Sequence, residues 1–378
     1  MEKIGLYCNW KVTPDGHGFY INPIHAKYLN ALLKMQYQVT LMSNTCSERV
    51  EGEIYYPYSE VGLVKLPNFD SYMKGFLYIK SIIYGCLKLL KYNDRIYIRT
   101  FEPASWLFSF FNFRGKNLHY HIVSNPISVI LENRDVPKLI RYIRVGIFYP
   151  EYILTLVAAK ANYFTCNGAS VLSNLPRIFR KSVRVIIESS LSQDDFYQNI
   201  SRDNFPVTKI LCVGYIRPAK GVDVLIKAVK TLAENHNVSL SIVGDGSYKD
   251  EMIALAEGLN VHDICEFHGF VPTGHALNEF YRSHDIFVMP SFSETGPRVV
   301  LEAMANSIYC ISTNVGYAPD VLSKERGVII PINSVSDIID SVAYFIKNRQ
   351  ELNDKIKSSY RYSKSFTLRS FFEDVFKD

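Results

Sequence analysis

The segment PSFSETGPRVVLEAMA, residues 290–305, carries more information about this chain than any other. It directly follows the apolar run IFVMP (286–290), which has the length and composition of a buried strand. The turn-like Thr295-Gly296-Pro297 comes next and precedes the start of a helix. The segment therefore predicts a strand, a loop and a helix N-terminus, the arrangement at which open α/β sheets bind their ligands.

Two carboxylates of this segment, Glu294 and Glu302, are expected beside the same crevice. Ionised carboxylates accept several hydrogen bonds, so they suit a hydroxyl-rich ligand such as a sugar diol. The alternative is a solvated glutamate in the first helical turn, stabilised by the helix dipole, together with an unrelated surface glutamate. Spacing alone leaves both interpretations open.

Length and composition indicate a two-domain protein. The chain has 378 residues, of which 48% are hydrophobic. This length is too great for one ordinary domain and suits two. The seven cysteines are scattered without a CxxC pair, so we expect reduced core residues in a cytosolic protein, without a disulfide frame or a zinc site. The first residues lack the apolar core of a signal peptide, and no window is apolar enough to span a membrane. We expect a soluble or membrane-peripheral protein.

Charge is unevenly distributed along the chain. Residues 1–200 hold 23 Lys and Arg against 15 Asp and Glu, whereas residues 201–378 hold 19 against 22. The first half is therefore expected to face something anionic. A nucleic-acid partner is disfavoured, because the basic residues form no stripe and the pI is only about 8.6.

Both halves alternate short apolar runs with segments of helical length, which predicts parallel βαβ units and two successive α/β domains. The polar stretch 189–206 is the expected linker. We place an N-terminal domain at 1–195, a C-terminal domain at 196–355 and a C-terminal helix at 356–378. The expected strands are 3–8, 38–43, 95–100, 117–123, 163–166 and 183–188 in the first half, and 209–214, 238–244, 264–269, 286–290, 309–313 and 327–331 in the second.

Two basic, aromatic-rich segments stand apart in the first half. Residues 71–91 carry four lysines and no acid, and residues 137–150 carry Lys138, Arg141 and Arg144 among aromatic and aliphatic residues. Such a composition suits a surface that lies against anionic lipid. A pair of core helices whose lysine tips are solvated is the commoner alternative.

The second domain opens with a candidate anion site. In KILCVGYIRPAKGVDVLIKAV (209–229), a strand ends at Gly214, and a loop with Arg217 and Lys220 precedes an amphipathic helix. Two cations at a helix N-terminus favour an anion, and a diphosphate is the natural ligand. Two surface loop charges are the alternative. The loop does not fit GxxxxGK[ST], and no strand is followed by GxGxxG with the expected acid downstream.

Taken together, these segments resemble the second domain of retaining, nucleotide-sugar-dependent glycosyltransferases of the glycosyl transferases group 1 (GT4-like) family. The resemblance is specific over 209–330 and looser over 5–43, which look like the first strand, glycine-bearing loop and helix of that family. The segments that carry it are VGYIRPAKG (213–221), IVGDG (242–246), FHGFVP (267–272), DIFVMPSFSETGPRVVLEAMA (285–305) and STNVG (312–316).

The resemblance implies the GT-B architecture, with two Rossmann-like α/β domains that face each other across a cleft. The first domain (1–195) is expected to bind the acceptor, the second (196–355) is expected to bind the nucleotide sugar, and the C-terminal helix is expected to pack back on the first domain. The resemblance also implies roles for single residues. Arg217 and Lys220 match the basic pair that neutralises the donor diphosphate in place of a metal ion, so neither a metal nor another cofactor is expected. Glu294 matches the residue that binds the transferred sugar, and Glu302 matches the one that holds the ribose.

Further donor-site residues follow from the same resemblance. The backbone of Thr295, Gly296, Pro297, Arg298 and Val299 is expected to line the donor after the strand that ends near Pro290. Phe270 and Val271 are expected to flank the base, while Gly214 ends the strand before the basic loop. Gly16 and Gly18 match a loop that approaches the phosphates or the acceptor. His121 is expected either to reach the sugar or to be a buried strand histidine.

Three positions depart from the family pattern. After Glu294 the usual Gly-Phe-Gly-Leu is replaced by Thr295-Gly296-Pro297-Arg298, and Pro297 has no N–H to donate. Gly316-Tyr317 stand in place of paired glycines, and Glu188-Ser189-Ser190 in place of Pro-Asn-Gly. No required charge is lost, so we expect an active enzyme.

The expected reaction is transfer of a sugar, with retention, from a nucleoside-diphosphate sugar to a hydroxyl of a glycan or polyprenyl-diphosphate-linked acceptor. Capsule, O-antigen or exopolysaccharide synthesis is the expected setting, in the cytoplasm or on the inner face of the cytoplasmic membrane. A nucleotide-sugar epimerase and an inactive, transferase-like binding protein are the alternatives. A glycosidase is rejected, because both glutamates resemble ligand-binding groups and the basic pair has no role in hydrolysis.

Overall fold

The computed structural model describes residues 1–69, 72–132, 136–198 and 206–377. It divides the chain into two compact units, the first formed by Met1–Glu188 and Leu368–Asp378 and the second by Ser189–Thr367. The division after Glu188 comes earlier than the boundary expected from sequence. Ser71 of the expected basic segment and residues 199–205 of the expected linker lie outside the described residues.

The first unit is built on a seven-stranded sheet in which all neighbouring strands are parallel, in the order β10-β9-β8-β7-β1-β4-β6. The chain runs outward from β1 on one side and then returns to β7 on its other side, so the order of strands reverses between β1 and β7. The strands are β1 (Lys3–Tyr7), β4 (Gln38–Asn44), β6 (Val61–Leu66), β7 (Arg95–Thr100), β8 (Asn117–Ile122), β9 (Tyr163–Asn167) and β10 (Arg184–Ile186).

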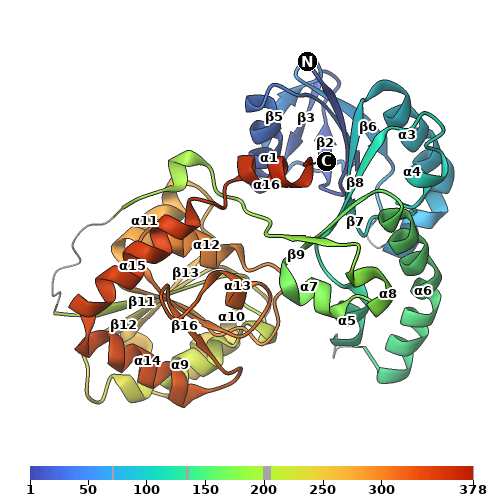
Figure 1. The fold of residues 1–378 in the computed structure, drawn as a ribbon. Coiled ribbons are helices and arrows are strands. Elements are labelled where there is room, and N and C mark those ends of the chain that lie inside the picture. Colours follow the sequence, from blue (N-terminus) through green and yellow to red (C-terminus); the bar gives the residue numbers. More distant parts are fainter. Residues whose placement is uncertain (70–71, 133–135, 199–205, 378) are drawn as a thin grey trace. The chain divides into compact units, whose positions relative to one another are not determined.

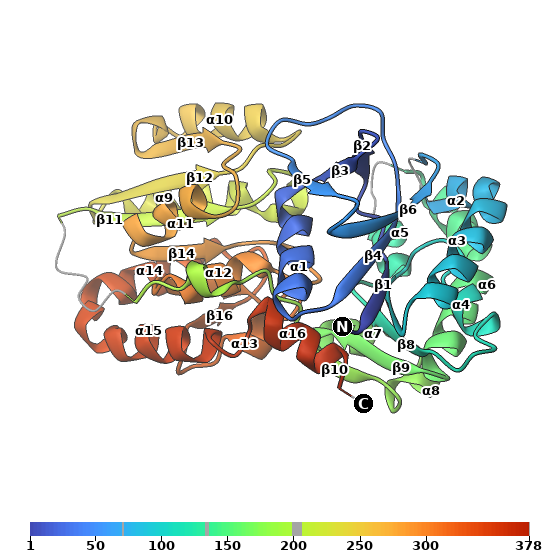
Figure 2. The same cartoon turned by 90° about the horizontal axis from the view of Figure 1, so that it is seen from above.

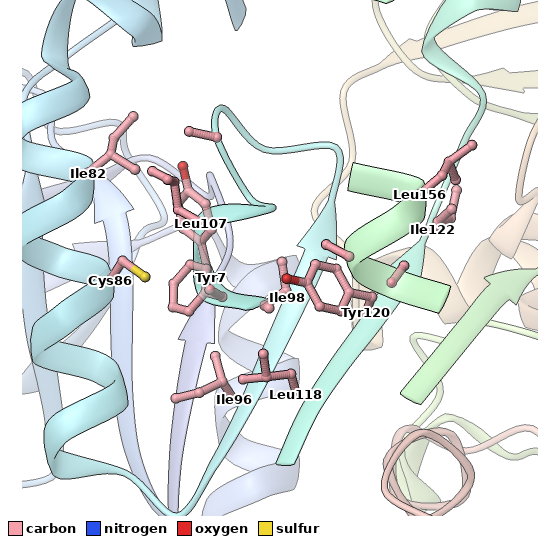
Figure 3. Close-up of a cluster of buried hydrophobic side chains, with 14 of the residues drawn as sticks. Tyr7, Ile82, Cys86, Ile96, Ile98, Leu107, Leu118, Tyr120, Ile122 and Leu156 are labelled. Carbon is pink, nitrogen blue, oxygen red and sulfur yellow. The ribbon is translucent and has the colours of Figure 1, made fainter. Parts of the chain in front are cut away.

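Helices cover both faces of this sheet, which explains why its strands are buried on both sides (Figures 1 and 2). On one face, the apolar spacing of Ile82, Cys86 and Leu89 turns one stripe of α3 toward the sheet. Figure 3 shows this core, with Cys86 and Ile82 facing Tyr7 and Leu107. The helices on this face include α3 (Ile79–Tyr92), α4 (Leu107–Phe110) and α6 (Lys138–Lys160), and α1 (Pro23–Lys34) and α16 (Leu368–Val375) cover the other.

The segment between β1 and α1, expected from sequence as a glycine-bearing loop, forms an antiparallel hairpin of β2 (Val12–Pro14) and β3 (Gly18–Ile21). The strand β5 (Ile54–Pro57) pairs with β3. The remaining short helices of this unit are α2 (Tyr72–Gly75), α5 (Pro126–Glu132), α7 (Gly168–Asn174) and α8 (Arg177–Arg180).

The second unit contains a parallel six-stranded sheet in the order β13-β12-β11-β14-β15-β16. Its order reverses between β11 and β14, as in a dinucleotide-binding fold. The strands are β11 (Thr208–Val213), β12 (Val238–Val243), β13 (Cys265–Gly269), β14 (Ile286–Met289), β15 (Tyr309–Thr313) and β16 (Val328–Ile330). The helices are α9 (Val222–Leu232), α10 (Lys249–Gly258), α11 (His275–Ser283), α12 (Arg298–Ala305), α13 (Ala318–Val321), α14 (Val335–Lys347) and α15 (Arg349–Ser363).

The C-terminal region is shared between the two units, which differs from the single helix expected over 356–378. Ile356 of α15 is buried in the core of the second unit. Only α16 joins the first unit, where Phe371 and Phe372 pack edge-on against Tyr28 of α1. The chain divides here because the apolar stripe of α15 is covered by the second unit and that of α16 by the first.

Candidate functional site

The candidate site lies within the second unit, where the loops that follow β11 and β14 meet at the carboxyl ends of the strands. Phe292 N–H donates to the carbonyl of Ala219, at 2.8 Å, and so ties the two loops together. Gly221 has φ +63°, and a Cβ at this position would lie 2.2 Å from the carbonyl oxygen of Pro290. Only glycine satisfies both constraints. The crossing point is therefore fixed by the backbone, at the place where the strand order reverses.

Two predicted site residues are paired across this crossing. The ammonium of Lys220 donates to Oε1 of Glu294, and Ser291 Oγ donates to the same oxygen at 3.0 Å. The side chains of Lys220 and Glu294 are 20% and 12% exposed, so both still reach solvent. Lys220 follows β11 and Glu294 follows β14, and the reversal of the sheet brings them together. The pair therefore places a cation and a carboxylate together at the carboxyl ends of the strands.

Arg217 lies in the same loop as Lys220 and is exposed. Within the described ranges its side chain has no hydrogen bond or ion pair, so the guanidinium is available to an anion. Gly214, at the start of this loop, donates its N–H to the carbonyl of Val243 at 2.9 Å. Gly214 also lies under the Lys220 side chain, because a Cβ there would be 3.7 Å from Nζ. The Lys220 side chain therefore packs over the backbone at the end of β11.

Two helices begin at this crossing without a side-chain cap. α9 starts after Gly221 and α12 starts after Pro297, and neither residue has a side chain that can accept from the first turn. Arg298 N–H donates to the carbonyl of Gly296 at 2.8 Å, which closes a tight turn before α12. Uncapped helix N-termini carry partial positive charge and bind anions. Both helix N-termini therefore lie on the same edge of the sheet as the Lys220–Glu294 pair, and the first turn of α9 also carries Asp223.

The loop before α12 is half-buried. Thr295, Gly296, Arg298 and Val299 are partly exposed, whereas Pro297 is buried. The loop after β15 supports it, because a Cβ at Gly316 would lie 2.8 Å from the Cδ atom of Pro297. The expected donor-lining residues therefore form one continuous loop next to Glu294, and the loop after β15 packs against it.

Glu302 is engaged inside the second unit. Its Oε1 accepts from Ser190 Oγ at 3.0 Å, and its Oε2 accepts from the Tyr281 hydroxyl at 3.1 Å. Burial raises the pKa of Tyr281 well above its usual value, and the charge of Glu302 raises it further. A carboxylate has about four acceptor sites, so one lone pair on each oxygen remains for a ligand. Neither hydroxyl partner was recognised from the sequence.

The other expected site residues lie on other elements of the two units. Phe270 and Val271 follow β13, an edge strand, and Phe270 is 75% exposed. Among the described residues, no hydrogen bond or ion pair joins either of them to Lys220 or Glu294. Gly16, with φ +97°, lies at the tip of the β2–β3 hairpin of the first unit, and Gly18 lies beside it at the start of β3. The hairpin alone accounts for Gly16, because its turn needs a left-handed residue.

His121 is a core residue of the first unit and has no exposed surface. Its Nδ1 is bonded to Thr165 Oγ1 at 3.0 Å, and its ring packs edge-on against Phe371 of α16. Burial lowers the pKa of this imidazole to about 4. Of the two interpretations that the sequence left open, the structure places the side chain as a buried strand histidine, and we assign it no role in transfer.

No group of three or more His, Cys, Asp or Glu side chains that could hold a metal ion is found among residues 1–69, 72–132, 136–198 and 206–377. Within the same ranges, no helix is both long enough and apolar enough to cross a bilayer.

The chain is similar to known proteins in sequence and in fold. A crystal structure of HepE from Anabaena in complex with UDP superimposes with a TM-score of 0.68, at 13% identity, over 99% of this chain and 98% of that one. An uncharacterized glycosyltransferase of Haemophilus influenzae is 28% identical over 368 residues, 94% of each chain. The O-antigen biosynthesis glycosyltransferase WclY of Escherichia coli is 27% identical over 202 residues, 51% of this chain and 55% of its own.

The two parallel sheets, each flanked by helices, define the GT-B class of fold, as the sequence predicted. Residues 195–362 match the family Glycosyl transferases group 1. The second unit therefore belongs to that family, and the chain is a glycosyltransferase.

Proposed function

We propose that this enzyme transfers a sugar, with retention of anomeric configuration, from a nucleoside-diphosphate sugar to a hydroxyl of a glycan or polyprenyl-diphosphate-linked acceptor. The observation that carries the proposal is the Lys220–Glu294 pair at the reversal point of the second sheet. A diphosphate needs cations, and a sugar needs hydrogen-bond acceptors. This crossing offers both side by side.

Departure of the nucleoside diphosphate is the demanding step, because negative charge develops on it as an oxocarbenium-like sugar forms. Arg217, Lys220 and the uncapped N-termini of α9 and α12 would stabilise that charge. Lys220 would turn from Glu294 toward the phosphate. Glu294, released from its partner, would then accept from hydroxyls of the transferred sugar.

Glu302 would hold the ribose through the lone pairs that Ser190 and Tyr281 leave free. Phe270 and Val271 would flank the base, while Gly16 and Gly18 would approach the phosphates. In this scheme protein cations replace a metal ion, so we propose that transfer needs neither a metal nor another cofactor. The UDP bound to HepE supports UDP-sugars as the first donors to test.

The acceptor proposal is supported by the name of WclY, an O-antigen biosynthesis glycosyltransferase. We place this enzyme in capsule, O-antigen or exopolysaccharide synthesis, at the inner face of the cytoplasmic membrane. A lipid-linked acceptor stays in that membrane, so the enzyme needs a surface that meets it.

The outer face of α6 supports such a surface on the first unit. Its large apolar side chains are open to solvent, including Leu139 at 72%, Ile143 at 52% and Ile147 at 58% exposure. Lys138 and Arg144 are exposed on the same helix. Its one acid, Glu151, is buried and accepts from Tyr72, Ala104 and Trp106, so α6 itself presents no exposed carboxylate to an anionic lipid.

The neighbouring helices extend this face. α4 packs against both α3 and α6, and Figure 1 shows the three on the same side of the sheet. On α3, Lys80, Lys88 and Lys91 are exposed together with Tyr84 and Leu87. Exposed apolar side chains together with exposed lysines and arginines are the pattern of a surface that binds an anionic bilayer.

Co-sedimentation with vesicles tests the membrane contact. We expect the protein to bind vesicles that contain phosphatidylglycerol and to stay in solution with pure phosphatidylcholine. Replacing Ile143 and Ile147 by glutamate should abolish binding, whereas Tyr344→Glu, at an equally exposed aromatic of the second unit, should not. Equal binding to both kinds of vesicle, or unimpaired binding of the α6 variant, would refute the contact.

Thermal stabilisation by a panel of UDP-, GDP-, ADP-, TDP- and CMP-sugars tests the donor site, because ligand binding raises apparent stability. We expect a shift with one nucleotide family, reduced in Glu302→Ala. Product analysis by NMR then separates the alternatives. Conversion of the donor without an acceptor indicates an epimerase, binding without turnover indicates an inactive relative, and an inverted product refutes retention.

A further inference from the structure

The carboxylate of Glu302 receives one hydroxyl donor on each of its oxygens. Ser190 Oγ donates to Oε1 at 3.0 Å, and the Tyr281 hydroxyl donates to Oε2 at 3.1 Å. The last torsion of a glutamate side chain is broad, so a carboxylate without partners turns easily about its own axis. Two donors, one on each oxygen, fix the plane of this carboxylate. Glu302 is only partly buried, so a ligand can still reach it.

The hydroxyl of Tyr281 is a rigidly placed donor. Tyr281 lies on α11, which packs against α12, and it has no exposed surface. Its ring contacts that of Phe287 on β14 edge-on, with 5.9 Å between the ring centroids. Burial raises the pKa of Tyr281 well above its usual value, and the charge of Glu302 raises it further, so the hydroxyl keeps its proton. Tyr281 therefore donates to Glu302 at every pH at which the protein is folded and active.

The hydroxyl of Ser190 comes from the segment that enters the second unit from the first. This segment is fastened to the second unit at two further points. Asn278 of α11 donates to Oδ1 of the buried Asp195 at 3.1 Å, and Tyr197 N–H donates to the carbonyl of Ala305, at the end of α12, at 2.9 Å. The segment is thus held against the two helices that carry the other members of the network.

Ser190 also lies in a stretch that departs from the family pattern. Glu188-Ser189-Ser190 stand where that pattern has Pro-Asn-Gly, so Ser190 takes the place of the glycine. Glycine has no side chain that can donate, and the hydrogen bond to Glu302 therefore depends on the residue that this chain has here.

A carboxylate that is held in this way suits a pair of neighbouring hydroxyl groups. Each oxygen of Glu302 keeps a lone pair for a ligand, and a fixed plane allows both to accept at the same time. The 2′- and 3′-hydroxyls of a ribose are such a pair, whereas 2′-deoxyribose offers only one of them. The orientation of the carboxylate thus bears on which nucleotides are accepted.

We propose that Ser190 and Tyr281 are positioning residues that orient Glu302 toward both hydroxyls of the donor ribose, and that this orientation makes the enzyme prefer ribonucleotides to 2′-deoxyribonucleotides. Donors built on 2′-deoxyribose are then poor substrates. The inference rests on the proposed function, since it requires a nucleotide in the second unit. Neither hydroxyl is assigned a contact with the substrate or a proton transfer.

Isothermal titration calorimetry of the full chain with UDP and 2′-deoxy-UDP tests the proposal, with the GDP and ADP pairs run alongside. The wild type should bind the ribonucleotide about tenfold or more tightly than its deoxy form. Ser190→Ala and Tyr281→Phe should each weaken the ribonucleotide about threefold to tenfold and the deoxy form less, so the preference narrows. Ser336→Ala and Tyr344→Phe, at exposed positions of α14, should leave both affinities unchanged.

A double-mutant cycle distinguishes positioning from a merely structural role. In a Glu302→Ala background, adding Ser190→Ala should not change the ratio of the two affinities further, because the group that Ser190 orients is already gone. Thermal unfolding shows whether each variant is folded.

An unchanged preference for the ribonucleotide in both Ser190→Ala and Tyr281→Phe would overturn the proposal, even if either variant were less stable. Equal affinity of the wild type for the two members of each nucleotide pair would also overturn it, and would leave the donor site standing. If the wild type bound none of these nucleotides, the proposed function itself would fail.

Discussion

The ammonium group of Lys220, in the loop after β11, donates a hydrogen bond to Oε1 of Glu294, in the loop after β14. The pair lies where the strand order of the second sheet reverses, and its hydrogen bond fixes the orientation of both side chains. A donor diphosphate would bind the Lys220 ammonium in place of Glu294. The Glu294 carboxylate would then accept hydrogen bonds from the sugar. The free enzyme thus keeps both charges compensated until the ligand arrives.

Replacing Lys220 by methionine should lower the rate of transfer by about 10² to 10³, because one preorganised donor to the leaving group is lost. The free energy of unfolding should change by only about 1 kcal/mol, since the pair still reaches solvent. Nucleoside-diphosphate release measures the rate, and chemical denaturation measures the stability. Lys227→Met, which removes an exposed pair with Asp223, is the matched control and should change neither.

Replacing Glu302 by alanine should lower the free energy of unfolding by about 1–3 kcal/mol, because the buried Tyr281 hydroxyl loses its acceptor. Glu302→Gln keeps an acceptor and should recover much of that stability while still weakening nucleotide binding. Comparing the two variants separates the contribution of Glu302 to stability from its contribution to nucleotide binding. Equal stability of Glu302→Ala and the exposed control Glu325→Ala would contradict the hydrogen bonds described for Glu302.

The buried imidazole of His121 should make the first unit sensitive to acid. Its pKa is about 4 in the folded protein against about 6.5 in an unfolded chain, so the unfolded state binds the proton more tightly. The resulting stability is complete above pH 6.5 and is lost as the pH falls toward 4, by up to about 3 kcal/mol. His121→Phe should flatten this dependence in denaturation measured across that range. His17→Gln, at an exposed histidine of the same unit, should not.

Glu102 should act on stability in the opposite direction. Its pKa of about 8 in the folded state exceeds the value of about 4.5 expected when unfolded, so the folded state holds the proton more tightly. Its contribution is complete below pH 4.5 and is lost as the pH rises through 8. Glu102→Gln should therefore stabilise the protein at pH 9 by about 1–3 kcal/mol, while its oxygen still accepts from Asn9. A destabilised variant at pH 9 would contradict the buried, ionisable carboxyl.

Much of the fold could be predicted from local patterns. Every strand expected from an apolar run is present, and β14, the loop and α12 follow one another as the segment 286–305 predicts. The strand β6 and the β2–β3–β5 sheet were missed, because their alternation is weak and their stability comes from pairing with distant strands. The division of the C-terminal region depends on which core covers each helix.

The sequence by itself determined the two α/β units and the chemistry available at their loops, because strand length, helix period and glycine position are local properties. Only the tertiary structure decided which groups meet. In the folded chain Lys220 forms an ion pair with Glu294, and Glu302 accepts hydrogen bonds from Ser190 and Tyr281. The ring of His121 packs against Phe371. These contacts join residues far apart in the chain, and they are set by strand order and packing, which no local period encodes.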